Sequence, residues 1–217
     1  MILAFLTAQT AEILEIVATV TFVIYLILQI FHSRYMWYLY IPSCICAALN
    51  FFNSGTWAFA ALNLYYIAMG VVGIIHWKKD KDSQQVEGST IPLHKLGWNT
   101  LNISVVISIV GIPALYFLLR WLNDPNPLLD SITTVLSVIG TWWLTRSYIV
   151  QWFVWITADI FAIWMNVNLG NKWFVLQFVL CIVSSIIGLH IWHRKGEYID
   201  AHVRGPEYPL KKGKKTT

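Results

Sequence analysis

Long runs of apolar residues, interrupted by very few charges, constrain the fold of this chain more than any other feature. A helix needs about 20 apolar residues to cross the hydrocarbon core of a bilayer. Seven segments reach or approach this length, and the second and fifth are the shortest. We expect membrane-spanning helices at residues 11–31, 37–52, 57–77, 101–122, 129–145, 149–167 and 172–192.

The composition supports a lipid environment. Of the 217 residues, 57% are hydrophobic and 12% are charged, whereas soluble domains have about 45–50% apolar and about 25% charged residues. A chain of this size cannot bury such an excess in its own core. The composition therefore argues against a soluble enzyme, a disordered chain and a nucleic-acid-binding protein.

Polar segments divide the chain into four parts. The longest polar loop covers residues 78–100, a proline-rich turn follows at 123–127, and a polar tail begins at Arg194. We expect a first three-helix unit at 1–77, a cytoplasmic loop with a linker helix at 78–122, a second three-helix unit at 123–193, and a basic cytoplasmic tail at 194–217.

The basic residues predict the orientation in the membrane. If the N-terminus is outside, all of the 15 lysines and arginines except Arg120 and Lys172 lie on the inner side. Cytoplasmic segments are enriched in lysine and arginine, so we expect the N-terminus outside and the C-terminus inside. The lysine-rich tail is expected to contact anionic lipids.

One sequence offset indicates an internal repeat. Residues 115 positions apart match at Glu15 and Asp130, Trp37 and Trp152, Gly73 and Gly188, and Trp77 and Trp192. Two three-helix units have the same orientation when a single helix links them. The sequence therefore predicts an all-α membrane protein with a 3+1+3 arrangement of parallel repeats, an arrangement that transporters use to hold a substrate near the bilayer midplane.

The third predicted helix places a stripe of residues on one face: Asn63, Tyr66, Gly70, Gly73 and Trp77. Small residues on such a face let neighbouring helices approach closely, which is the interpretation we favour for the two glycines. A side-chain amide in a membrane needs a polar partner. Asn63 and Tyr66 are therefore candidate substrate-binding residues.

The sixth predicted helix carries the deepest carboxylate, Asp159, on the same face as Trp152 and Trp155, with Gln151 beside them. An ionisable residue within a span indicates a functional site. Indole faces hold cationic rings, although Trp152 and Trp155 could also anchor the helix at the interface, because Arg146 lies nearby. On the seventh helix, Gln177 begins a mildly polar stripe.

Motifs for other chemistry are absent from the sequence. It contains no H-E-x-x-H, G-x-S-x-G or P-loop pattern, and Asp159 has no evident second carboxylate for an intramembrane acid–base pair. His76, His190 and His193 lie near membrane boundaries, without a carboxylate or cysteine at metal-ligand spacing. We expect no catalytic residues, metal or cofactor, and therefore no enzyme.

Two segments resemble the PnuC family of vitamin transporters. Residues 145–159, TRSYIVQWFVWITAD, resemble the family signature before and within its sixth helix, and residues 61–77 resemble its third-helix pattern. The resemblance implies a fold similar to SWEET sugar carriers, a homotrimer in the bacterial inner membrane, and facilitated diffusion of a cationic B vitamin. A cytoplasmic kinase then traps the vitamin, without necessary contact with the transporter.

The resemblance implies that nicotinamide riboside is the substrate, with thiamine as the alternative. Thiamine stays open because Val72 and Ile74 replace two aromatic residues of many members, and Gln151 replaces a frequent asparagine. A less favoured hypothesis is a non-transporting scaffold that binds partners through its loop and tail. The implied substrate-binding residues are Asn63, Tyr66, Gln151, Trp152, Trp155, Asp159 and Gln177.

Overall fold

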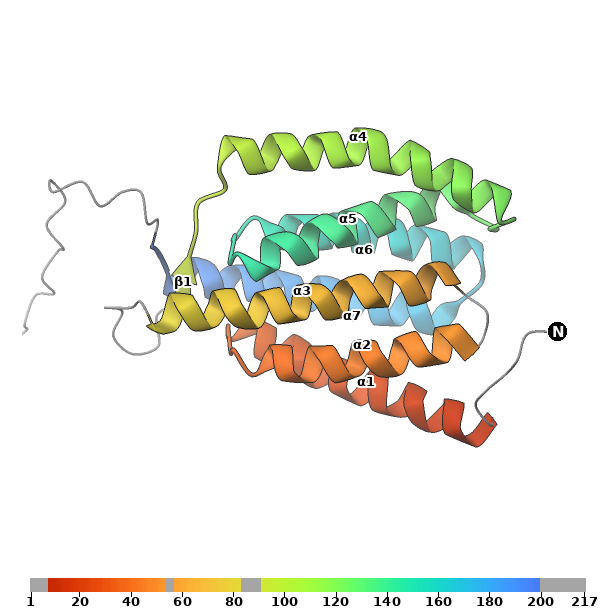
Figure 1. Ribbon diagram of the computed structural model, residues 1–217, viewed down its shortest axis with the longest axis horizontal. Helices are drawn as coiled ribbons and strands as arrows, with labels where there is room; N and C mark the ends of the chain where they lie inside the picture. The colour runs from red at the N-terminus through yellow and green to blue at the C-terminus, as the bar shows by residue number, and fades with distance from the viewer. Residues whose placement is uncertain (1–7, 54–56, 83–90, 200–217) are drawn as a thin grey trace, which may run out of the picture.

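The computed structural model describes residues 8–53, 57–82 and 91–199, and these form seven α-helices and two short strands (Figure 1). The helices are α1 (Ala8–Ile30), α2 (Met36–Asn53), α3 (Trp57–Asp82), α4 (Trp98–Trp121), α5 (Pro127–Thr145), α6 (Gln151–Asn168) and α7 (Lys172–Lys195). Each predicted span corresponds to one helix. The largest difference is at α3, which continues past Trp77 because the charged residues that follow favour helix and can extend into water.

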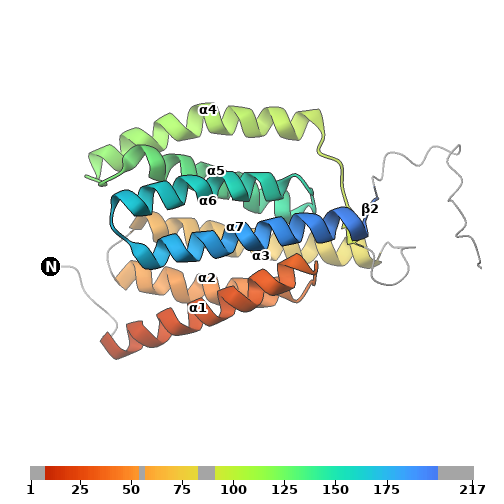
Figure 2. The ribbon, with the colours of Figure 1, turned by 180° about the vertical axis from the view of Figure 1, so that it is seen from behind.

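Six of the helices form a closed ring, and the seventh lies outside it. The packing order is α1, α2, α3, α5, α6, α7 and back to α1, while α4 packs on α5 (Figures 1 and 2). Helices α1, α3, α5 and α7 run in the same direction and finish at the end of the bundle that carries the strands. We call this the β-strand end and the opposite one the far end.

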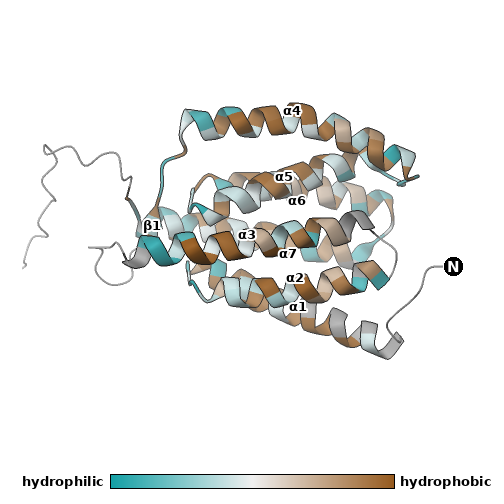
Figure 3. Cartoon of the chain, in the orientation of Figure 1, coloured by the Kyte–Doolittle hydropathy of each residue, from teal (hydrophilic) through white to brown (hydrophobic). Residues whose placement is uncertain are grey.

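Four helices contain segments that are long and apolar enough to cross a membrane: Ala60–Asp80, Trp98–Trp121, Pro127–Thr145 and Phe174–Lys195. Helix α4 shows this clearly, because most residues in its middle are hydrophobic (Figure 3) and few of them are buried within the protein. Its terminal residues Trp98 and Trp121 are 80% and 77% exposed, as expected for indoles at the two membrane interfaces. The protein is therefore a multi-pass membrane protein.

A tryptophan–glycine contact occurs twice, 115 residues apart. Gly73 on α3 lies so close to the ring of Trp37 that a Cβ atom would collide with it, and Gly188 on α7 lies in the same way against Trp152. Trp37 meets Trp77 edge to face with 5.4 Å between ring centroids. Trp152 meets Trp192 in the same arrangement at 5.2 Å. These glycines allow the close approach of α2 to α3 and of α6 to α7.

Two short strands join the ends of α3 and α7. Strand β1 (Ile91–Leu93) pairs in parallel with β2 (Gly196–Tyr198), and the Ile199 N–H donates to the Leu93 carbonyl at 2.8 Å. Ile91 and Leu93 are buried in the same cluster as the tryptophans of the ring. Strand β1 lies in the polar loop expected at 78–100, and β2 lies in the polar tail expected from Arg194. Neither strand is predicted from the sequence, because three residues are too few to show an alternating pattern.

Candidate functional site

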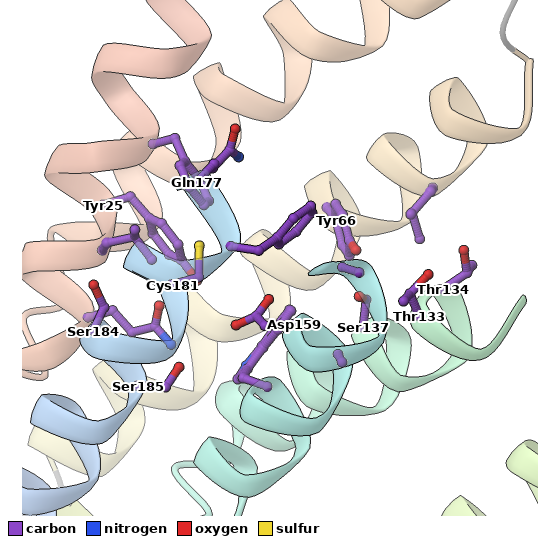
Figure 4. A pocket seen from close by; sticks show the side chains of 18 of the residues that line it. Tyr25, Tyr66, Thr133, Thr134, Ser137, Asp159, Gln177, Cys181, Ser184 and Ser185 are labelled. Carbon is purple, nitrogen blue, oxygen red and sulfur yellow. The ribbon is translucent and has the colours of Figure 1, made fainter. Parts of the chain in front are cut away.

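The six helices of the ring surround a cavity of about 300 Å³, at the lower limit for small-molecule sites. Figure 4 shows Tyr25, Tyr66, Asp159 and Cys181 around the same space. Its aromatic residues are Phe22, Tyr25, Tyr40, Tyr66, Trp152, Trp155 and Phe178. Its polar residues are Gln29, Asp130, Thr133, Thr134, Ser137, Asp159, Gln177, Cys181, Ser184 and Ser185.

The polar groups of the cavity are distributed unevenly between the two halves of the ring. Helices α1 to α3 supply three tyrosines and the amide of Gln29, but no carboxylate, to the lining that the structure describes. Helices α5 to α7 supply both carboxylates, Asp130 and Asp159, together with the amide of Gln177 and most of the hydroxyl groups. Aromatic rings come from both halves, so a ligand with one aromatic part and one hydroxyl-bearing part fits this lining.

Asp159 is the central polar group of the site. It lies on α6, is only 6% exposed and points toward the cavity (Figure 4). No described residue donates a hydrogen bond to its carboxylate or forms an ion pair with it. None of the lysines, arginines and histidines in the described part of the chain lines the cavity. Because an isolated buried charge is costly, the site is suited to a ligand that itself carries a positive charge.

The two tryptophans of the family-like signature occupy different positions in the cavity. Trp152 is 2% exposed and packs on Gly188, so its ring faces other helices and not lipid. Trp155 is half-buried and packs on Gly140. The indole N–H groups of both residues are buried without a hydrogen-bond partner in the described structure, which leaves two donors and two ring faces near Asp159.

The structure brings five of the seven predicted site residues to one cavity: Tyr66, Trp152, Trp155, Asp159 and Gln177. Asn63 and Gln151 are buried but do not line it. Gln151 is fully buried, and neither its Oε1 nor its Nε2 has a hydrogen-bond partner in the part of the chain that the structure describes.

Sequence reasoning missed several lining residues on α1 and α2. Tyr40 and Tyr25 contribute rings whose centroids are 4.9 Å apart, and the Gln29 side chain is buried beside them. The 115-residue offset contains the signal for Tyr40, because this residue corresponds to Trp155 in the other half. No comparable pattern marks Tyr25 or Gln29, since aromatic and amide residues on a single apolar helix do not reveal which face turns inward.

A profile of the family described as "Nicotinamide mononucleotide transporter" matches residues 12–194. The chain belongs to this transporter family. Members of this family are transporters and not enzymes, which agrees with the sequence analysis. The match includes most of each of the seven helices and every residue of the cavity, so the membership applies to the part of the chain that contains the site.

Two known proteins resemble the chain. One is "Nicotinamide riboside transporter PnuC" from Neisseria mucosa, 24% identical over 136 residues, which are 59% of this chain and 52% of the relative. The chain thus spans about half the length of this relative. The other is a solved structure, "Crystal structure of the Vitamin B3 transporter PnuC", with a TM-score of 0.63 and 20% identity, covering 86% of this chain and 88% of that one. This second likeness shows a shared fold.

Proposed function

We propose that this protein carries nicotinamide riboside across the membrane. The observation that supports the proposal most strongly is the unpaired carboxylate of Asp159 in an aromatic-lined cavity that has no basic residue in its described lining. The nicotinamide ring of the riboside carries a permanent positive charge, which indole faces and a carboxylate both stabilise. The names of both relatives refer to vitamin B3 or its riboside.

The same cavity argues for the nucleoside and against the mononucleotide. A phosphate group is recognised by arginine, lysine or a helix N-terminus. Here the lining presents two carboxylates, Asp130 and Asp159, and no described basic side chain. A bound mononucleotide would place its phosphate among like charges without a counter-charge. The nucleoside carries only the positive ring and a hydroxyl-bearing ribose.

In this proposal the ligand lies across the two halves of the ring. Trp152 and Trp155 stack on the nicotinamide ring near Asp159, Tyr66 closes the opposite wall, and Gln177 bonds the ribose hydroxyls. Asn63 and Gln151 do not line the cavity in this conformation. We propose that they contact the substrate only when the ring has rearranged, and the unpaired amide of Gln151 supports this role.

The transport cycle follows from the proposed architecture. All seven helices cross the membrane, the N-terminus is outside, and the β-strand end faces the cytoplasm of a bacterium. Residues 1–77 and 123–193 are parallel repeats joined by a linker at 78–122, as in SWEET carriers, and they rock about the cavity. The recurrence of the tryptophan–glycine contacts at an offset of 115 supports the repeat. Residues 83–90 and the tail from 200 onward lie outside the described residues.

Transport is proposed to be facilitated diffusion, with a cytoplasmic kinase that traps the substrate and a homotrimeric assembly in the inner membrane. Purified protein in proteoliposomes should take up labelled nicotinamide riboside until the concentrations inside and outside are equal. A proton or sodium gradient should not change that endpoint. Accumulation driven by either gradient would contradict facilitated diffusion.

Competition experiments test the substrate. Unlabelled riboside should compete in the same liposomes, whereas nicotinamide mononucleotide at equal concentration should not. Thiamine, which is also cationic, is the necessary comparison, and stronger competition by thiamine than by the riboside would reverse the substrate assignment. If no ligand is taken up and none shifts the melting temperature, the scaffold hypothesis gains support over transport.

A further inference from the structure

The loop between α1 and α2 inserts a histidine ring between two tryptophans. His32 stacks on Trp77 with 3.8 Å between ring centroids and 8° between the planes, and it meets Trp192 edge to face at 4.9 Å. The φ angle of His32 is 50°, a backbone conformation that residues other than glycine rarely adopt. The surrounding contacts therefore hold this ring in a defined position.

The connection between α5 and α6 presents the partner of this ring. Ser147 is fully buried, has a φ angle of 52°, and lies 115 residues after His32. The His32 Nε2 and the Ser147 Oγ are 3.0 Å apart. Two residues at equivalent positions of the two halves thus share the same unusual backbone conformation and form a hydrogen bond with each other.

Two indole N–H groups also donate hydrogen bonds between the halves at the same level. The Trp77 Nε1 of α3 donates to the carbonyl of Leu144 near the end of α5, at 3.3 Å. The Trp192 Nε1 of α7 donates to the carbonyls of Gln29 and Ile30 at the end of α1, at 3.3 and 3.1 Å. The Leu144 and Gln29 carbonyls also accept the backbone N–H groups of Ser147 and His32. The indoles therefore add a second donor to each carbonyl and hold the helix ends together across both contacts between the halves.

This layer closes the cavity on one side. The cavity extends from Asp130, in the first turn of α5 at the far end, to Gln29 and Trp152, and both of these adjoin the His32 layer. On the side of that layer toward the β-strand end, β1 lies against the same tryptophans. The His94 N–H donates to the Ser147 carbonyl at 3.4 Å. In this conformation a ligand in the cavity is separated from the β-strand end by the rings of His32, Trp77 and Trp192.

We propose that His32 and Ser147 form the latch of a gate that closes the cavity toward the β-strand end, and that their hydrogen bond must break before the substrate can leave on that side. This inference rests on the proposed function and adds residues to it that line no part of the cavity. The latch lies between the two halves, so it opens when the halves move apart at this end.

A zinc bridge tests the latch with one substitution. Ser147→Cys places a thiolate beside the His32 Nε2, and zinc joins such atoms through bonds of about 2.0 and about 2.3 Å. In proteoliposomes, we expect micromolar zinc to reduce riboside uptake by Ser147→Cys at least tenfold. A chelator should reverse this inhibition. Zinc should not inhibit the wild type or the control His32→Gln/Ser147→Cys, which retain the native cysteines.

Each result bears on the latch. Of the three proteins, only Ser147→Cys should melt at a higher temperature with zinc, because the bridge joins the two halves. A zinc-dependent rise without loss of uptake would overturn the proposal, since the latch would then stay closed during transport. If zinc does not raise the melting temperature, His32 and residue 147 are not adjacent, and the latch is overturned.

The proposed function can fail independently of the latch. If the wild type takes up no riboside, transport of that substrate is contradicted. The latch is then tested by whether zinc protects the introduced thiol from maleimide labelling. Zinc must slow maleimide labelling of the introduced thiol in Ser147→Cys and must not do so in the His32→Gln/Ser147→Cys control. Equal labelling in the two proteins would overturn the latch.

Discussion

Trp77 and Trp192 each donate an indole hydrogen bond to the helix of the other half, to the carbonyls of Leu144 and Gln29. The two donors are 115 residues apart, and so are the two acceptors. The bonds are thus related by the same offset as the contacts of Trp37 and Trp152. They hold together the two places where the halves meet at the β-strand end.

The close tryptophan–glycine contacts predict a steric effect. A Cβ atom at Gly188 would collide with the ring of Trp152, so Gly188→Ser should lower the free energy of unfolding by about 1–3 kcal/mol. Thermal unfolding in detergent measures this. The matched control is Gly97→Ser, because nothing lies within 4 Å of a Cβ atom there and serine is favoured at a helix N-cap. Equal losses in both variants would contradict the packing argument.

The carboxylate of Asp159 predicts a charge effect on binding. Asp159→Asn keeps the size of the side chain but removes the counter-charge of a cationic ligand, which is worth about 1.5–3 kcal/mol for a charged contact. Riboside affinity should therefore fall by about 10- to 150-fold in isothermal calorimetry. Glu197→Gln, on the exposed strand β2, removes the same charge far from the cavity. If both variants bind like the wild type, Asp159 does not face the ligand.

The half-buried position of Trp155 predicts a stacking effect that can be separated from folding. Trp155→Ala should weaken riboside binding by about 1–3 kcal/mol, the usual range for a stacked base. Trp155→Phe retains a ring and should recover most of the affinity. Trp164→Ala is the control on the same helix, since that side chain is 57% exposed. An alanine variant with wild-type affinity would remove Trp155 from the proposed site.

The burial of His32 predicts a pH dependence of the latch. Burial lowers the pKa of His32 to about 3, whereas a ring exposed to water by opening would regain a pKa near about 6.5. Between these values the open state binds a proton that the closed state does not. Acidification below about pH 6.5 therefore favours opening, by about 1.4 kcal/mol for each pH unit. Above that pH, the opening of the latch should not depend on pH.

This pH dependence can be measured as the initial rate of riboside uptake between about pH 7.5 and about pH 5.5 on the β-strand side, a range that brackets the pKa of an exposed histidine. The riboside keeps its charge in this range, so the ligand does not titrate. Among the described residues, Asp80 and His94 are the groups whose charges act on His32. His94→Gln should therefore retain the increase at low pH, and His32→Gln should lose it. An increase that survives in His32→Gln would assign the effect to another group.

The positions of the helices were accessible from the sequence because transfer into lipid is a local property of each segment. The predicted ends agree with the structure to within a few residues at most helices, and α3 differs because lysines at 78 and 79 remain helical beyond the apolar run. Asp159 and the signature tryptophans were also accessible, since a charge within an apolar span is rare.

The composition of the cavity was only partly accessible. Gln151 adjoins Trp152 in the sequence but does not line the cavity, whereas Tyr25, with no motif around it, does. Which face of a helix turns inward depends on the helices packed against it. A helix that is apolar on all sides gives no amphipathic signal to decide the matter.

The sequence by itself determined that the chain enters a membrane, which segments form its helices, and that a 115-residue offset relates its tryptophans and glycines. Only the tertiary structure decided that His32 meets Ser147, that β1 pairs with β2, and that the carboxylates of the cavity come from one half of the ring. The physical reason is that hydrophobicity and helix length are properties of neighbouring residues. A contact between residues far apart in the chain depends on how all six helices of the ring pack together.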